Sequence, residues 1–117
     1  MASDAEVAQA LQRRAPADER LLVRHFLAVL AQRAPGRSVE VRVPPYAAVQ
    51  AVPGVRHTRG TPPAVIETDA ATWISLATGE LEWARAEAEG LLEASGQRAD
   101  LTEFLPLHPE LSDQPNA

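Results

Sequence analysis

Apolar residues recur at helical spacing in the first third of the chain. The residues that follow Ser3 begin with the Ser-x-x-Glu spacing of a capping box, which predicts a short first helix. A longer stripe starts at Asp18 and ends before Pro35 and Gly36, and its apolar positions are Leu22, Phe26, Val29 and Leu30. This second stripe predicts the main amphipathic helix of the protein.

The middle of the chain alternates apolar and polar residues, as a strand with one wet face does. Residues 38–43 predict burial of Val39, Val41 and Val43 and exposure of Glu40 and Arg42. Further strands are predicted at residues 46–52, 64–68 and 91–95, and the proline- and glycine-rich residues 53–63 form a long loop. One wet face is typical of antiparallel sheets.

Three more helices are predicted around these strands. Asp69 can cap a helix that ends at Gly79 and buries Trp73 and Leu76 on one side. A short helix covers about residues 82–89. Asp100 and Glu103 have the spacing of another capping box, for a last helix that Pro106 stops; its apolar residues are Leu101, Phe104 and Leu105.

This order of elements predicts an α+β fold in which helices cover one face of a small, mainly antiparallel sheet of four to five strands. The 117 residues suffice for one domain. We expect an N-terminal helix and linker over residues 1–17, the domain itself over residues 18–107, and a flexible tail over residues 108–117.

Composition excludes several classes of chemistry and of partner. The absence of cysteine excludes disulfides and thiolate chemistry, and suits a reducing compartment such as the cytoplasm. A net charge of −5 argues against a nucleic-acid partner, because binding to phosphates needs clustered positive charge. No signal peptide is expected from the first residues, and the longest apolar run, residues 26–31, is too short for membrane insertion.

Two phrases carry a family resemblance. LATGEL, residues 76–81, and GLLEASG, residues 90–96, follow a strand and a helix in the order found in the sterol carrier protein family. Residues 34–46 and 56–63 look like a compact bacterial branch of that family, and the resemblance covers about residues 18–107. It implies a helix-covered sheet enclosing an apolar tunnel for lipids, sterols or acyl chains, with no chemistry of its own. The strand region is shorter here than in the larger members, so the tunnel could be reduced or closed.

The predicted ligand site is an apolar cavity between the helices and the sheet. Small alanines on the strands opposite large helix residues leave room for a ligand, or else let the helices approach the sheet closely. Arg56 or Arg59, in the long loop, would lie at the polar end and hold a carboxylate or phosphate. The cavity is expected to be lined by Phe26, Leu30, Val49, Ile66, Trp73 and Leu76.

We expect no catalytic residue, metal or cofactor. Glu67 and Asp69 could form a carboxylate pair, but Asp69 is better explained as a helix cap. The histidines, at positions 25, 57 and 108, do not have metal-ligand spacing. The expected function is therefore non-enzymatic carriage of an apolar small molecule or lipid. The alternatives are a protein-interaction module without an open cavity and an accessory domain to a separate enzyme, and the sequence leaves the oligomeric state open.

Overall fold

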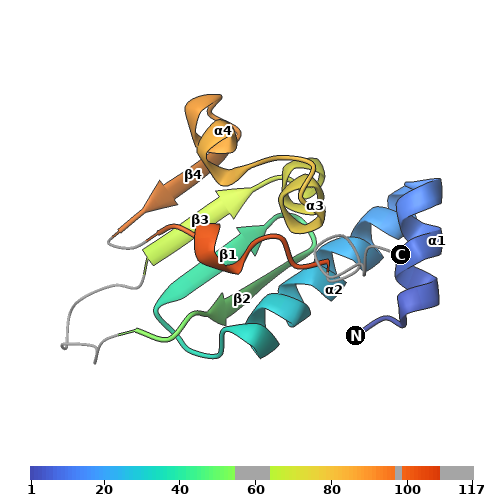
Figure 1. Cartoon of the computed structure of the whole chain (residues 1–117), viewed down its shortest axis with the longest axis horizontal. Helices are drawn as coiled ribbons and strands as arrows, with labels where there is room; N and C mark the ends of the chain where they lie inside the picture. Colours follow the sequence, from blue (N-terminus) through green and yellow to red (C-terminus); the bar gives the residue numbers. More distant parts are fainter. Residues whose placement is uncertain (55–63, 97–98, 109–117) are drawn as a thin grey trace, which may run out of the picture.

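A computed structural model gives the fold, and it describes residues 1–54, 64–96 and 99–108. Helices and strands follow one another nearly in the order that the sequence predicts (Figure 1). The elements are α1 (Asp4–Arg13), α2 (Pro16–Arg33), β1 (Val39–Val43), β2 (Ala47–Ala51), β3 (Ala64–Thr68), α3 (Ala70–Thr78), α4 (Trp83–Ala88), β4 (Leu92–Ser95) and the 3-10 turn η1 (Thr102–Phe104).

The four strands form one sheet in the order β2-β1-β3-β4. The two outer pairs, β1 with β2 and β3 with β4, are antiparallel, whereas the central pair, β1 with β3, is parallel. Val41 in β1 is opposite Val49 in β2 and Ile66 in β3. The predicted α+β class and the mainly antiparallel sheet are confirmed.

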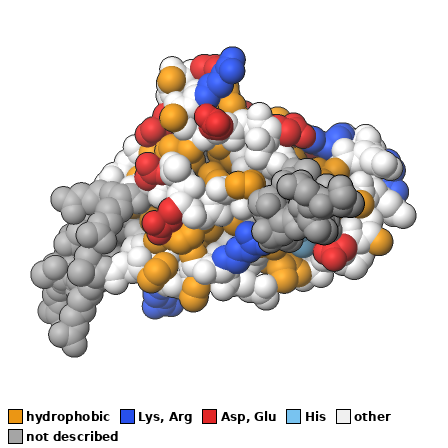
Figure 2. Space-filling view, in the orientation of Figure 1, with side chains coloured by type: hydrophobic (Ala, Val, Ile, Leu, Met, Phe, Trp, Pro, Cys, Tyr) orange, Lys and Arg blue, Asp and Glu red, His pale blue; other side chains and the backbone are white. Residues whose placement is uncertain are grey.

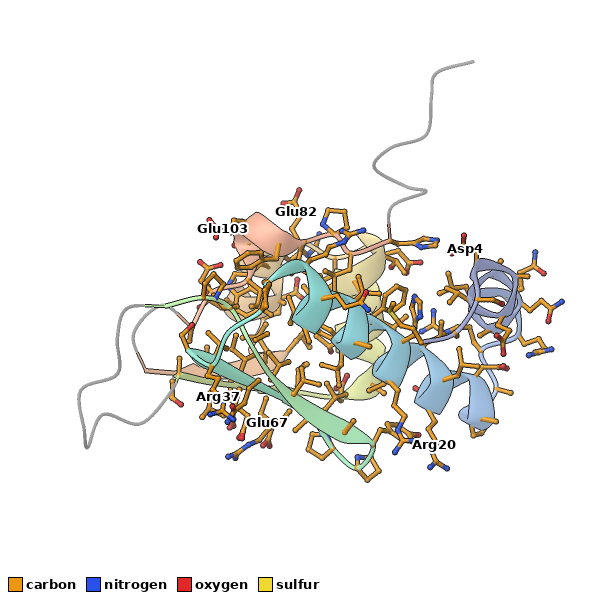
Figure 3. The ribbon with its side chains drawn as sticks, turned by 90° about the horizontal axis from the view of Figure 1, so that it is seen from below. Asp4, Arg20, Arg37, Glu67, Glu82 and Glu103 are labelled. Atoms are coloured by element: carbon orange, nitrogen blue, oxygen red, sulfur yellow. The ribbon has the colours of Figure 1, made fainter. Side chains whose placement is uncertain are left out.

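Helices cover one face of this sheet and leave the other open (Figure 3). Val39, Val41 and Val43 are buried beneath the helices, whereas Arg42 is exposed and Glu40 is half-buried. Arg42 and Glu40 form an ion pair of 2.9 Å on the open face. The predicted burial of the three valines and exposure of Arg42 are confirmed, Glu40 is less exposed than predicted, and the alternation fixes which face of the sheet carries the core.

Two of the predicted helix caps form as expected. The Ser3 hydroxyl accepts a hydrogen bond from the Glu6 amide at 3.2 Å, and the Glu6 carboxylate accepts one from the Ser3 amide at 3.0 Å. The Asp69 carboxylate accepts from the Thr72 amide at 2.7 Å, and α3 ends at Gly79 with a φ of +86°. Local sequence thus determines where α1 begins and where α3 begins and ends.

The junction between α1 and α2 depends on Asp18. Its carboxylate accepts hydrogen bonds from the Ala15 amide at 3.0 Å and from the Arg13 guanidinium at 2.9 Å. The hydrogen bond from Arg13 lowers the pKa of Asp18 below its ordinary value. Because Pro16 needs no amide partner and Asp18 caps the first turn, α2 starts two residues before the predicted position.

The predicted last helix is wrong. The structure has a single 3-10 turn there, because one oxygen of the Asp100 carboxylate accepts from the Thr102 amide at 2.7 Å and not from Glu103. Beyond the turn, the amides of Leu107 and His108 donate to the Ala77 carbonyl at 2.8 and 3.1 Å. His108, at the start of the expected tail, is buried, and residues 109–117 lie outside the described residues.

Candidate functional site

The structure brings the predicted cavity residues into one core. Phe26 and Leu30 come from α2, Trp73 and Leu76 from α3, and Ile66 from β3. The Trp73 indole N–H donates to the Val23 carbonyl at 3.3 Å and so joins the two helices. Val49, on β2, is half-buried and packs against the same core.

These core side chains are closed to solvent. Each of the five on α2, α3 and β3 exposes at most 1% of its surface, so water-sized space does not adjoin them. Of the alanines expected to leave room, Ala51 and Ala64 are buried, but Ala48 and Ala94 are exposed. A ligand would have to displace core side chains to occupy this position, and the cavity stays a prediction. Arg56 and Arg59 lie outside the described residues.

An open groove lies beside η1. It has a volume of about 510 Å³, within the range of small-molecule sites. Val52 and Pro53, which follow β2, line one side, and Phe104 lines the other with the polar residues Asp100, Thr102 and Glu103. Figure 2 shows apolar side chains next to acidic ones on this face of the molecule. Hydrophobic contact surface is therefore available here without unpacking the core.

Val52, which lines the groove, has a strained backbone conformation. Its φ is +71°, which is unfavourable for a β-branched residue. The Val52 amide donates to the Ala34 carbonyl at 2.6 Å, and its carbonyl accepts from the Ser38 hydroxyl at 2.7 Å. A Cβ on Gly36 would lie 2.2 Å from the Val52 carbonyl oxygen, so glycine is required for this contact. These interactions tie the groove to the C-terminal end of α2.

Comparison with known protein families identifies the domain. A family model described as bacterial SCP ortholog matches residues 13–107. The chain belongs to this sterol-carrier-protein-like family. The match begins at the last residue of α1, so that nearly all of α1 precedes it. A search of curated proteins gives no match.

Membership of the sterol-carrier-like family confirms the resemblance seen in the sequence. No helix in the described part of the chain is long and apolar enough to cross a membrane. Within the same residues, His, Cys, Asp and Glu side chains do not form a group of three or more that could hold a metal ion.

Glu67 and Asp69, which the sequence suggests as a possible carboxylate pair, have different roles in the structure. Asp69 caps α3, as expected. Glu67 lies on β3, on the open side of the sheet, and its register neighbours are Arg42 and Glu93. Both residues line one open hollow at the edge of the sheet, but the Asp69 carboxylate is engaged by the Thr72 amide as the helix cap.

Phe26, in the middle of α2, packs against two histidine rings. The ring of Phe26 packs edge-on against His25 at 5.0 Å and against His108 at 6.0 Å, measured between ring centres. Burial lowers the pKa of His25 below its ordinary value, and its Nδ1 is buried without a hydrogen-bond partner in the described part of the chain. A neutral imidazole is therefore favoured at this position.

Sequence reasoning missed the groove. The sequence predicts a strand end at Val52 and a helix at Phe104, and no local pattern indicates that the two residues line one groove. One available signal was composition: Phe104 is one of few aromatic residues, since such residues make up 4% of the chain. An aromatic side chain in a short polar segment before a proline is a reasonable candidate for a binding surface.

Proposed function

We propose that this domain binds an apolar small molecule or lipid, and that the ligand enters at the groove beside η1. The observation that carries the proposal is the apolar lining of an open hollow of about 510 Å³ by Val52, Pro53 and Phe104. Removal of such surface from water contributes roughly 25 cal/mol per Å². Sterol carrier proteins are generally carriers without catalysis, which supports a non-enzymatic role.

The groove adjoins one end of the predicted cavity. The Val52 amide bonds to Ala34, and the Ala34 amide in turn bonds to the carbonyl of Leu30 at 2.8 Å. Leu30 belongs to the predicted cavity lining, so the backbone links the groove to the core, where a ligand would have to displace closely packed side chains. Deeper entry, between Phe26, Trp73 and the sheet, is part of the proposal.

The test compares substitutions of two apolar residues, one that lines the groove and one that lies elsewhere on the surface. Phe104→Ala removes the aromatic wall of the groove, whereas Leu91→Ala removes a side chain that is 39% exposed elsewhere on the surface. Binding of a fluorescent fatty acid should weaken at least about fivefold in Phe104→Ala, as expected for loss of an interface aromatic. It should stay unchanged in Leu91→Ala. Equal affinities in both variants would contradict the groove as the binding site.

A second candidate is a protein-interaction module that keeps the fold without an open cavity. The observation that favours it is the closed core, in which Phe26, Trp73 and Leu76 are at most 1% exposed. Mass spectrometry of the natively purified protein separates the two. A co-purified lipid supports the carrier, whereas a clean apo mass and no saturable binding of lipids support the interaction module, either alone or as accessory to a separate enzyme.

A further inference from the structure

We infer that mild acid releases α1 from α2, and that protonation of His25 drives the release. This conformational device does not depend on the proposed function. Its basis is the meeting of three parts of the chain at His25. They are the first residues of the chain, α2 itself, and the C-terminal segment that contains His108.

The first residues of the chain and α2 share a small hollow at His25. Its volume is about 230 Å³, and Met1 and Ala2 form one side of it. The other side is formed by the α2 residues Leu21, Arg24, His25 and Ala28. The segment that leads into α1 therefore lies directly beside the His25 side chain.

The buried nitrogen of His25 lacks an acceptor. Its Nδ1 has no hydrogen-bond partner in the described part of the chain. The neutral ring can leave this nitrogen unprotonated, whereas the charged ring carries a hydrogen on both nitrogens. Protonation would therefore create a buried donor without an acceptor, beside the apolar ring of Phe26. Burial lowers the pKa of His25 below its ordinary value for the same reason.

The charges that face His25 come from each part of the chain around it. The N-terminal amine and His108 both oppose its protonation, and Arg24 lines the same hollow. Asp4, at the start of α1, favours protonation, but it is exposed and therefore screened by water. The closed arrangement disfavours the charged ring, and movement of the N-terminal segment would give that ring access to water.

α1 is weakly held and can respond to this change. Two of its ten residues are buried, Val7 and Ala10. It lies across one end of α2, away from β4 (Figure 1), and nearly all of it precedes the matched family domain. A short helix with so small an interface opens at a lower free energy than the core does.

The junction between α1 and α2 stays closed over the same pH range. Asp18 is buried and pairs with Arg13 at 2.9 Å. The hydrogen bond from Arg13 lowers the pKa of Asp18, so this pair keeps its charges where a histidine titrates. The left-handed Arg14, with a φ of +53°, turns the chain next to the pair. We therefore expect α1 to pivot about residues 14–16, with its N-terminal end moving furthest.

The experiment uses single cysteines, because the chain has none of its own. Val7→Cys places a thiol on the buried side of α1, and Ala8→Cys places one on the exposed side. Their rates of labelling by 4,4′-dithiodipyridine are compared as a ratio, which cancels the pH dependence of the thiol. We expect the ratio of the Val7→Cys rate to the Ala8→Cys rate to rise at least about threefold as the pH falls from about 7.5 to about 5.

Further variants assign the rise to His25 and to α1. In the Val7→Cys and Ala8→Cys backgrounds, His25→Gln and His25→Phe should each make the ratio independent of pH. His108→Gln should retain the rise. So should Glu110→Gln with Asp113→Asn, which neutralises the acidic residues of the stretch 109–117 outside the described residues. Val41→Cys, in β1, should stay protected from the reagent throughout.

Hydrogen exchange of the unsubstituted protein provides the same test if a variant does not fold. After correction for the intrinsic exchange rate, amides of residues 4–13 should lose protection in acid, while those of β1 keep it. A ratio that does not change with pH overturns the inference. So does a rise that survives in both His25 variants, a rise that depends on His108 or the C-terminal acids, or equal loss of protection in α1 and β1.

Discussion

The helix–sheet core and the groove beside η1 both contain apolar side chains, but they differ in how these are held. In the core, Phe26, Leu30 and Trp73 are at most 1% exposed, because they are enclosed between the helices α2 and α3 and the covered face of the sheet. In the groove, Val52 and Phe104 remain half-buried around an open hollow. The difference teaches that the core supplies stability, whereas the groove offers contact surface that is ready for a ligand.

Removal of a large core side chain is expected to give the largest change in the free energy of unfolding. Trp73→Ala should lower the free energy of unfolding by about 3–5 kcal/mol, because it deletes a buried ring and leaves a cavity. Phe104→Ala should lower it by no more than about 1.5 kcal/mol, since Phe104 is only half-buried. Urea unfolding curves measure both. Equal losses would show that the groove is part of the core.

The strain at Val52 gives a smaller expected effect on stability. Val52→Gly should change the free energy of unfolding by less than about 1 kcal/mol, because relief of the left-handed strain offsets the entropy that glycine adds to the unfolded chain. Val49→Gly, in the middle of β2, has no strain to relieve and should destabilise by more than about 1 kcal/mol.

The comparison of Val52 and Val49 is made in one denaturant series. If Val52→Gly costs as much as Val49→Gly, the left-handed conformation of Val52 carries no strain. A ligand that binds the wild type but not Val52→Gly would in addition show that the strained residue positions the groove.

The smallest expected effect is the dependence of stability on pH at His25. Burial lowers the pKa of His25 in the folded state. As the pH falls below about 6.5, the ordinary pKa of histidine, the unfolded chain therefore binds a proton at His25 before the folded protein does. The contribution to stability is therefore complete above that pH and is lost as the pH falls toward the folded pKa.

Replacement of this histidine isolates the effect. His25→Gln should reduce the slope of stability against pH in this window by less than one proton, measured by urea unfolding at several pH values. The groove residues carry no histidine, so ligand affinity should not follow the same titration. An unchanged slope in His25→Gln would refute the assignment to His25.

Much of the fold was predictable because it depends on short-range patterns. The alternation Val39, Val41, Val43 identified the buried face of β1, and Asp69 with Gly79 identified the bounds of α3. The same reasoning failed at the last helix, where a capping-box spacing was overridden by the turn that Asp100 makes with Thr102.

The candidate site was predictable only in part. Helical spacing and strand alternation indicated that Phe26, Leu30, Ile66, Trp73 and Leu76 share one interior, but could not tell a dense core from a cavity. The groove arises from the approach of two distant segments and from a valine in a conformation that its sequence gives no reason to expect. Such features depend on tertiary contacts.

The most direct test of the central claim is to locate a bound ligand by NMR. A fatty acid with a nitroxide spin label near its head group should broaden the amide signals of Val52 and Phe104 first, and the Trp73 indole signal less. This order places the head group at the groove with the core behind it. Broadening confined to the open face of the sheet, at Val65 and Gln50 for example, or no broadening at all, would contradict the account.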